Sequence, residues 1–145
     1  GLVGSEMCIR DSCNLTSIYY MLGRDDYSSW HRIKSNETWY HHLGATVEIH
    51  LIDPRQQTYH MYLLGHPQSI EGATWQVNIQ PGDIFAARLS PISEEPYALT
   101  GCAVGPGFEF EDFELISKES VMQAMPSMDA SVVEAFSAAE GSQAV

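Results

Sequence analysis

The chain has 145 residues, and its seven Lys and Arg against 19 Asp and Glu give a formal net charge of -12. That length suits one domain with a sizeable core, and the excess of negative charge repels phosphate backbones and anionic membrane surfaces, so we expect neither nucleic acid nor a membrane as a partner. No apolar run approaches the roughly 18 residues of a membrane span, and three cysteines cannot build a disulfide framework, so we expect a cytoplasmic protein.

The first residues stand apart from the rest of the chain. The segment Leu2 to Ser12 reads LVGSEMCIRDS, which resembles the translation of a transposase sequencing adapter. We therefore expect residues 1–12 to be adapter-derived and disordered. Residues 13–116 are then one domain whose natural amino terminus is missing.

Short segments rich in β-branched and aromatic residues recur through this domain and predict strands. Turn signals such as Gln80-Pro81-Gly82-Asp83 separate them. Many short strands without helical segments between them are typical of a β-sandwich or a barrel and argue against a parallel α/β sheet. The expected strands are 16–22, 28–33, 37–43, 46–52, 58–64, 74–79, 83–89, 97–104 and 112–116.

Residues 117–145 lack the strand pattern of the domain and carry helix-start signals, which predicts a helical tail with one or two short helices. Ser117 can cap a first helix that Pro126 ends, and Asp129 can cap a second helix over 132–139. We expect this tail to pack as a lid or as a surface appendage.

Histidines gather in the middle of the chain. Four of the six lie between Trp30 and Leu51, in a stretch that also holds Glu37 and Glu48. Imidazoles and carboxylates bind divalent metals or transfer protons near neutral pH, so this stretch predicts a pocket. The alternative is that these residues cover one face of a sheet.

Strand alternation assigns these side chains to faces. In 37–43, the residues Glu37 and Trp39 share one side with His41, and Tyr40 and His42 point to the other. In 46–52, the apolar residues 47, 49 and 51 oppose residues 48 and 50. We expect the acid at position 48 to face the interior of a barrel, where polar side chains make a binding site.

The order of several segments resembles a known family. These segments are TSIYYML at 16–22, SWHRI at 29–33, ETW at 37–39, HLG at 42–44, EIHLI at 48–52, GCAVGPGF at 101–108 and DFEL at 112–115. Together they resemble the short RmlC-like cupins of the domain-of-unknown-function 985 family. The resemblance implies an all-β fold, a double-stranded β-helix or jelly-roll cupin barrel, with its pocket inside and a homodimeric assembly. It also implies that an upstream helix and strand are missing.

The general metal-binding motif of cupins fits this chain only in part. His31 takes the place of its first His, Glu37 that of its Glu and Gly44 that of its closing Gly. Ile33, however, stands at the second His, and the place of the third is near Phe85 or Ala86. A transition metal generally needs at least three protein ligands. A divalent transition metal is therefore possible but disfavoured, and no cofactor is certain.

These observations lead to three function hypotheses. In the first, a small polar molecule such as a sugar or a nucleotide-sugar fragment binds in the barrel between aromatic walls. In the second, a metal-free epimerase or isomerase pairs His31 or His42 as base with Tyr40 or Tyr62 as acid. A metal-dependent cupin enzyme is the third, and a non-enzymatic interaction or storage role is the alternative to all of them.

The candidate residues fall into two groups by role. The candidate catalytic residues are His31, His42 and Tyr40. The candidate ligand-binding residues are Trp30, Arg32, Glu37, Trp39, Glu48, Tyr62 and Phe85.

Overall fold

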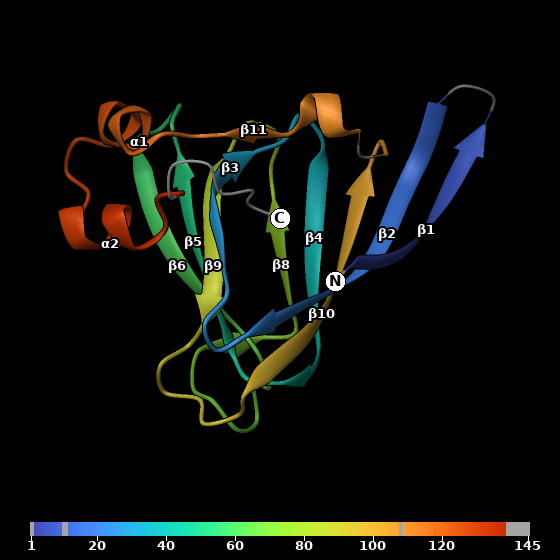
Figure 1. The fold of residues 1–145 in the computed structure, drawn as a ribbon, viewed down its shortest axis with the longest axis horizontal. Coiled ribbons are helices and arrows are strands. Elements are labelled where there is room, and N and C mark those ends of the chain that lie inside the picture. The colour runs from blue at the N-terminus through green and yellow to red at the C-terminus, as the bar shows by residue number, and fades with distance from the viewer. Residues whose placement is uncertain (1, 10–11, 108, 139–145) are drawn as a thin grey trace.

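Two β-sheets facing each other make up most of the protein (Figure 1). The computed structural model describes residues 2–9, 12–107 and 109–138. One sheet, sheet A, has the strand order β1-β2-β10-β4-β8, and the other, sheet B, has the order β11-β3-β9-β5-β6-β7. The strands are β1 (Leu2–Ile9), β2 (Ser12–Gly23), β3 (Tyr27–Arg32), β4 (Asn36–Gly44), β5 (Val47–Asp53), β6 (Thr58–Leu64), β7 (Ala73–Thr74), β8 (Gln76–Ile79), β9 (Ile84–Leu89), β10 (Tyr97–Gly105) and β11 (Glu114–Leu115).

This arrangement confirms the predicted all-β double-stranded β-helix. Each of the nine predicted strand segments coincides with strand in the structure, and two of them are shorter or broken. The segment 74–79 is split at Trp75 into β7 and β8, and the segment 112–116 contains the end of a 3-10 turn, Phe110–Asp112, before the short β11.

Strand β1 was not expected. Residues 2–9 pair antiparallel with β2, with Val3 opposite Tyr19 and Ser5 opposite Ser17, where the sequence led us to expect disorder. This pairing satisfies main-chain N–H and C=O groups of β2 and makes β1 the edge strand of sheet A. An adapter origin for this segment stays a prediction, and residues 1, 10 and 11 lie outside the described part of the chain.

The main core fills the space between the two sheets. It takes its side chains from both of them, because alternate residues of each strand point to the inner face. Its members include Tyr20, Leu22, Trp39, Val47, Ile49, Leu51, Phe85, Ala87 and Cys102.

A second core lies on the outer face of sheet B, under the two helices α1 (Lys118–Ala124) and α2 (Ala130–Ala135) (Figure 1). Trp30 and Ile84 from the sheet pack there against Val121 and Phe136 from the tail. The two helix caps are as predicted, since the side chain of Ser117 accepts a hydrogen bond from the backbone N–H of Ser120 and that of Asp129 from Ser131. The second helix, predicted over 132–139, instead runs from Ala130 to Ala135, because it begins directly after its cap. The tail thus covers sheet B; residues 139–145 lie outside the described part.

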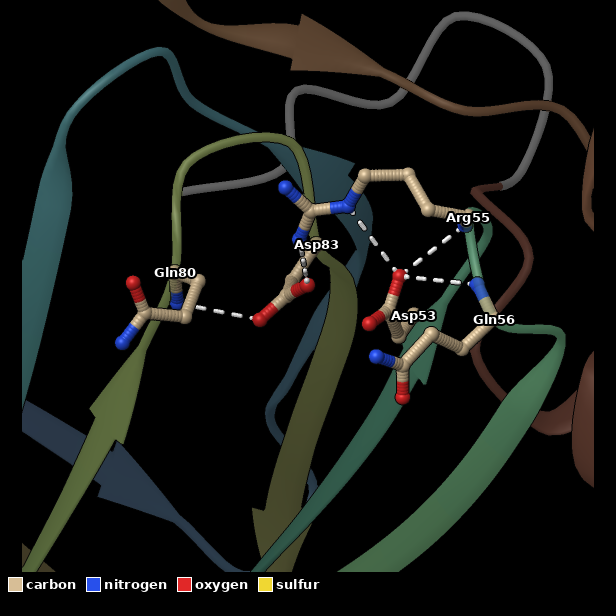
Figure 2. A network of polar contacts seen from close by, with 5 residues as sticks. All are labelled: Asp53, Arg55, Gln56, Gln80 and Asp83. Atoms are coloured by element: carbon tan, nitrogen blue, oxygen red, sulfur yellow. Dashed lines mark hydrogen bonds and ion pairs between the residues drawn. The ribbon is translucent and has the colours of Figure 1, made fainter.

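At one end of the barrel a polar network joins two turns (Figure 2). Arg55 lies between Asp53 and Asp83, with N···O distances of 3.2 and 3.1 Å, and Asp83 also accepts the backbone N–H of Gln80 at 2.9 Å. The network ties the end of β5 to the start of β9. Among the described residues, no helix is both long and apolar enough to cross a membrane.

Candidate functional site

Strand β4 carries an acid into the barrel interior. Glu37 is only 8% exposed, and its Oε1 accepts a hydrogen bond from the indole Nε1 of Trp39 at 2.7 Å. Both side chains point inward because they are two residues apart on one strand. On the neighbouring β10, Cys102 pairs with Trp39 and contributes its thiol to the surroundings of the carboxyl.

This enclosure changes the acidity of the carboxyl. Burial raises the pKa of Glu37 to about 7, against the opposing effect of the hydrogen bonds from Trp39 and Cys102. Burial likewise raises the pKa of the Cys102 thiol, and the neighbouring Glu37 adds to that. Tyr20, whose ring lies 5.4 Å from that of Trp39, has its pKa raised by burial to about 12. All three groups are therefore held in their neutral forms near pH 6.

A bulge in β3 turns His31 into the interior. Ser28 pairs with Ala87 and His31 with Phe85, so two residues of β3 lie opposite the single Ala86 of β9. His31 is then enclosed between the rings of Phe85 and Phe113, at centroid distances of 4.0 and 5.1 Å.

His31 is a neutral base in this position. Its Nδ1 lies 2.7 Å from the carbonyl oxygen of Ser29; because a carbonyl only accepts, Nδ1 carries the proton and Nε2 keeps its lone pair. Burial lowers the pKa of His31 to about 4, although the Ser29 carbonyl acts in the opposite direction. The ring can accept a hydrogen bond at Nε2 without becoming charged at physiological pH.

These groups lie at the same end of the barrel as the network of Arg55. His31 is next to the last residue of β3, Glu37 is the second residue of β4 and Phe85 is the second residue of β9. The short β11 pairs with β3 there and crosses that end in Figure 1. We call His31, Glu37, Trp39 and Phe85 the interior site; it offers a hydrogen-bond acceptor, a carboxyl of near-neutral pKa and aromatic faces.

Four of the ten candidate residues make up the interior site, and a fifth, Tyr62, lies on the inner face of sheet B. Tyr62 on β6 is half-buried and packs against the main core, with its ring 4.4 Å from that of His60.

Three ligand-binding candidates on sheet B instead face away from the barrel interior. Trp30 is buried in the second core, where its indole Nε1 donates to the carbonyl of Val133. Arg32 forms a two-pronged ion pair with Glu114 of β11, at 2.8 and 3.1 Å. Glu48 lies under the helical tail, because its neighbours Val47 and Ile49 occupy the inward positions of β5.

Two catalytic candidates lie on the outer face of sheet A. Tyr40 is 38% exposed and points opposite to Trp39. His42 is the extra residue of a bulge, since Thr100 pairs with His41 and Leu99 with Leu43. Its ring lies over Gly101, where an added Cβ would meet Nε2 at 2.5 Å, and 5.6 Å from the ring of Tyr19.

The geometry therefore separates His31 from the other two candidate catalytic residues. His31 lies inside the barrel, whereas Tyr40 and His42 lie outside the opposite sheet. An epimerase dyad needs groups that face each other across one space, and neither His31 with Tyr40 nor His42 with Tyr62 does so. The other two pairs, His31 with Tyr62 and His42 with Tyr40, stay predictions.

The residues of the interior site do not fit a transition metal. Phe85 occupies the position near the third His of the cupin motif and packs its ring on His31, and Ile33 supplies no donor atom. Within residues 2–9, 12–107 and 109–138, no three His, Cys, Asp or Glu side chains come close enough to hold a metal ion. Two donors, His31 and Glu37, fall short of the usual three.

Sequence reasoning missed several polar residues that the structure brings into play. Tyr20 and Cys102 border Glu37, and only the pairing of β2, β10 and β4 brings them there. On the outer face of sheet B, Tyr59 and His50 lie in contact. The sequence signal for that contact was the polar alternation of Glu48 and His50, but the cross-strand partner depends on the β5–β6 register.

The fold and the interior site define a cupin-type barrel. The family description "Cupin superfamily (DUF985)" matches residues 10–116, and the chain belongs to this family, as its sequence pattern predicts. Among curated proteins, none matches the chain.

Solved structures with this fold include similar proteins from distant organisms. A protein from Shewanella oneidensis is 30% identical, with a TM-score of 0.81, over 94% of this chain and 85% of that one. A hypothetical protein from Leishmania major is 24% identical, with a TM-score of 0.80, over 95% and 89%. A dTDP sugar isomerase from Desulfovibrio desulfuricans is 11% identical, with a TM-score of 0.60, over 91% and 94%, and shares the fold alone.

Proposed function

We propose that the protein binds a small, uncharged polar molecule, a sugar or the sugar part of a nucleotide sugar, in the barrel next to Glu37. The observation that carries this proposal is the enclosure of Glu37 between the indole of Trp39 and the thiol of Cys102. A carboxyl in this position is protonated below its pKa of about 7. It can then donate a hydrogen bond to a ligand oxygen as well as accept one.

The energetic cost of Glu37 supports a role in binding. A polar group placed in an apolar core lowers stability unless its hydrogen bonds are complete, and strongly shifted pKa values are frequent where side chains meet a ligand. A hydrophobic residue of similar volume would stabilise the barrel more. The acid is thus better explained by a ligand hydroxyl than by folding.

The other residues of the interior site suit a sugar-like ligand. The rings of Trp39 and Phe85 present apolar faces to C–H groups, and the neutral His31 offers an acceptor at Nε2 to a hydroxyl. The dTDP sugar isomerase shares the barrel, but at 11% identity the choice of ligand class rests on the side chains of this chain.

Thermal unfolding with added ligand tests the proposal. We would measure the unfolding midpoint with D-glucose, D-galactose and UDP-glucose, about one pH unit below and one above the pKa of about 7. A ligand at about 100 times its dissociation constant adds roughly 2.7 kcal/mol to stability. We expect a rise in the midpoint at the lower pH and a smaller rise at the higher pH, where the carboxyl has lost its proton.

Matched variants separate the acid from the barrel as a whole. Glu37→Leu should abolish the ligand-induced rise, whereas Glu37→Gln, which mimics the protonated carboxyl, should keep it and lose its pH dependence. Tyr40→Phe, on the outer face of sheet A, should respond as the unaltered protein does. An unchanged rise in Glu37→Leu, or no rise with any of the three compounds, would reject the proposal.

A further inference from the structure

A second polar group lies outside the barrel, on the outer face of sheet B. Its members are Glu48 and His50 on β5, Tyr59 on β6 and Arg88 on β9; we call them the outer relay. Glu48 pairs with Arg88 across β5 and β9, and alternation along β5 places His50 on the same face as Glu48. None of these four residues belongs to the interior site.

The hydrogen bonds of the outer relay all lead toward the carboxylate of Glu48. His50 Nε2 lies 3.0 Å from Oε2 of Glu48, and Arg88 donates its Nε–H to the same oxygen at 3.1 Å. Burial alone would raise the pKa of Glu48, but the hydrogen bonds from His50 and Arg88 hold it below its ordinary value. An ionised carboxylate only accepts, so His50 carries its proton on Nε2.

That tautomer leaves the lone pair of His50 Nδ1 directed at Tyr59. The phenol oxygen of Tyr59 lies 2.6 Å from Nδ1, so the phenol donates to the imidazole. The order of hydroxyl, imidazole and carboxylate is the one by which a general base activates a nucleophile, with the base oriented by a third group.

The surroundings protect the imidazole and leave the phenol more open. His50 is 4% exposed, and the ring of Phe136 lies 4.7 Å from it and 5.2 Å from the guanidinium carbon of Arg88. Tyr59 is only half-buried. Burial and then the charge of Glu48 raise the pKa of Tyr59, and Asp129 adds to this whereas Arg88 opposes it, so the phenol keeps its proton until it reacts.

We propose that Tyr59 is a nucleophile that accepts acyl groups from activated esters, with His50 as its general base and Glu48 as the residue that positions His50. The Tyr59 oxygen forms a bond to the ester carbonyl carbon as its proton passes to Nδ1 of His50. The bond to the leaving alkoxide or phenoxide then breaks, and that group departs with the bonding electron pair. The charge of the resulting imidazolium is balanced by Glu48.

The test uses 4-nitrophenyl acetate with the full chain and follows the site and rate of acetylation by peptide mass spectrometry. We expect Tyr59 to be acetylated at least tenfold faster than Tyr19, even though Tyr19 is 54% exposed. This ratio is measured in the unaltered protein and so does not depend on whether any variant folds. Equal or slower acetylation of Tyr59 would overturn the proposal.

Three variants identify the roles of the partners. His50→Gln should slow acetylation of Tyr59 by about a hundredfold, the usual scale of general base catalysis, and Tyr59→Phe should remove the adduct without changing the unfolding midpoint by more than a few degrees. Glu48→Gln should also slow the reaction, and nitrogen NMR should show that the proton of His50 is no longer confined to Nε2. An unchanged rate in a folded His50→Gln variant would assign the outer relay to structure alone.

This inference is independent of the proposed ligand in the barrel. Glu37→Leu changes the interior site and should leave acetylation of Tyr59 unchanged.

Discussion

His31 and Glu37 are both buried in the barrel, and burial moves their pKa values in opposite directions, to about 4 and about 7. As the pH rises, His31 loses its proton at a lower pH in the folded protein than in the unfolded chain, and Glu37 loses its proton at a higher pH. Between pH 4.5 and 6.5, the ordinary values of the two groups, their contributions to the pH dependence of stability have opposite signs and largely cancel. Each single substitution should therefore uncover the effect of the other residue.

Replacing the acid should stabilise the protein at high pH. Because the folded pKa of Glu37 is raised from 4.5 to about 7, its stabilising contribution is complete below pH 4.5 and is lost as the pH rises through about 7. The difference between the two values corresponds to about 3 kcal/mol. Glu37→Gln removes this loss, so its free energy of unfolding, measured with urea, should increase relative to the unaltered protein from pH 4.5 to 8. A difference independent of pH would contradict the enclosure of the carboxyl.

Replacing the base should have the opposite sign. The folded pKa of His31 is lowered from 6.5 to about 4. Its contribution to the free energy of unfolding is therefore fully present above pH 6.5 and is lost as the pH falls through about 4. The loss again amounts to about 3 kcal/mol. His31→Gln should thus gain stability relative to the unaltered protein as the pH is lowered from 6.5 to 4. A relative gain on raising the pH would show that His31 is charged inside the barrel.

The tail should contribute strongly to stability through Phe136. Its side chain is fully buried, with the ring 5.5 Å from that of Trp30. Phe136→Ala removes this packing from the second core and should lower the free energy of unfolding by about 3–5 kcal/mol. Ile92→Ala, at a position 65% exposed, is the control and should change it by less than about 0.5 kcal/mol. Equal effects of the two substitutions would mean that the tail is not packed on sheet B.

Arg24 should hold the loop between β9 and β10. Its guanidinium donates to the backbone carbonyls of Ser90 and Ser93 at 2.9 and 2.7 Å, and to that of Glu95. Arg24→Lys keeps the charge but loses the fork of donors, so both it and Arg24→Met should make residues 90–96 more susceptible to limited proteolysis. If only Arg24→Met is cleaved faster, the charge matters and the fork does not.

Added metal should leave the protein unchanged. The interior site offers only His31 and Glu37 as donors, and Phe85 fills the neighbouring position. We expect the unfolding midpoint to be the same after treatment with a chelator and after addition of Mn²⁺ or Zn²⁺. A saturable rise in the midpoint that disappears in Glu37→Leu would show that two protein donors suffice here.

The order of the strands and the caps of the two helices followed from local signals, but the direction of individual side chains did not. Alternation correctly placed Glu37 and Trp39 together because β4 is regular at that point. Alternation could not predict the bulges at Ser29–Trp30 and His42. Each bulge adds a residue and changes which side chain faces inward.

The faces of β5 depended on tertiary structure. Both faces of this strand are covered, one by the main core and the other by the helical tail, so burial of Glu48 did not mean that it pointed into the barrel. Its partner Arg88 and the covering residue Phe136 lie 40 and 88 positions further along the chain. Only the folded arrangement brings them together.

The pairing of β1 with β2 uses main-chain atoms. The edge of β2 that β1 occupies can therefore bind an extended backbone almost regardless of its side chains. Any expression tag or fusion linker placed ahead of residue 12 could pair with this edge. A proline-rich spacer, which lacks the N–H groups for a ladder, would keep such an appendage off the sheet and leave the edge of β2 free for study.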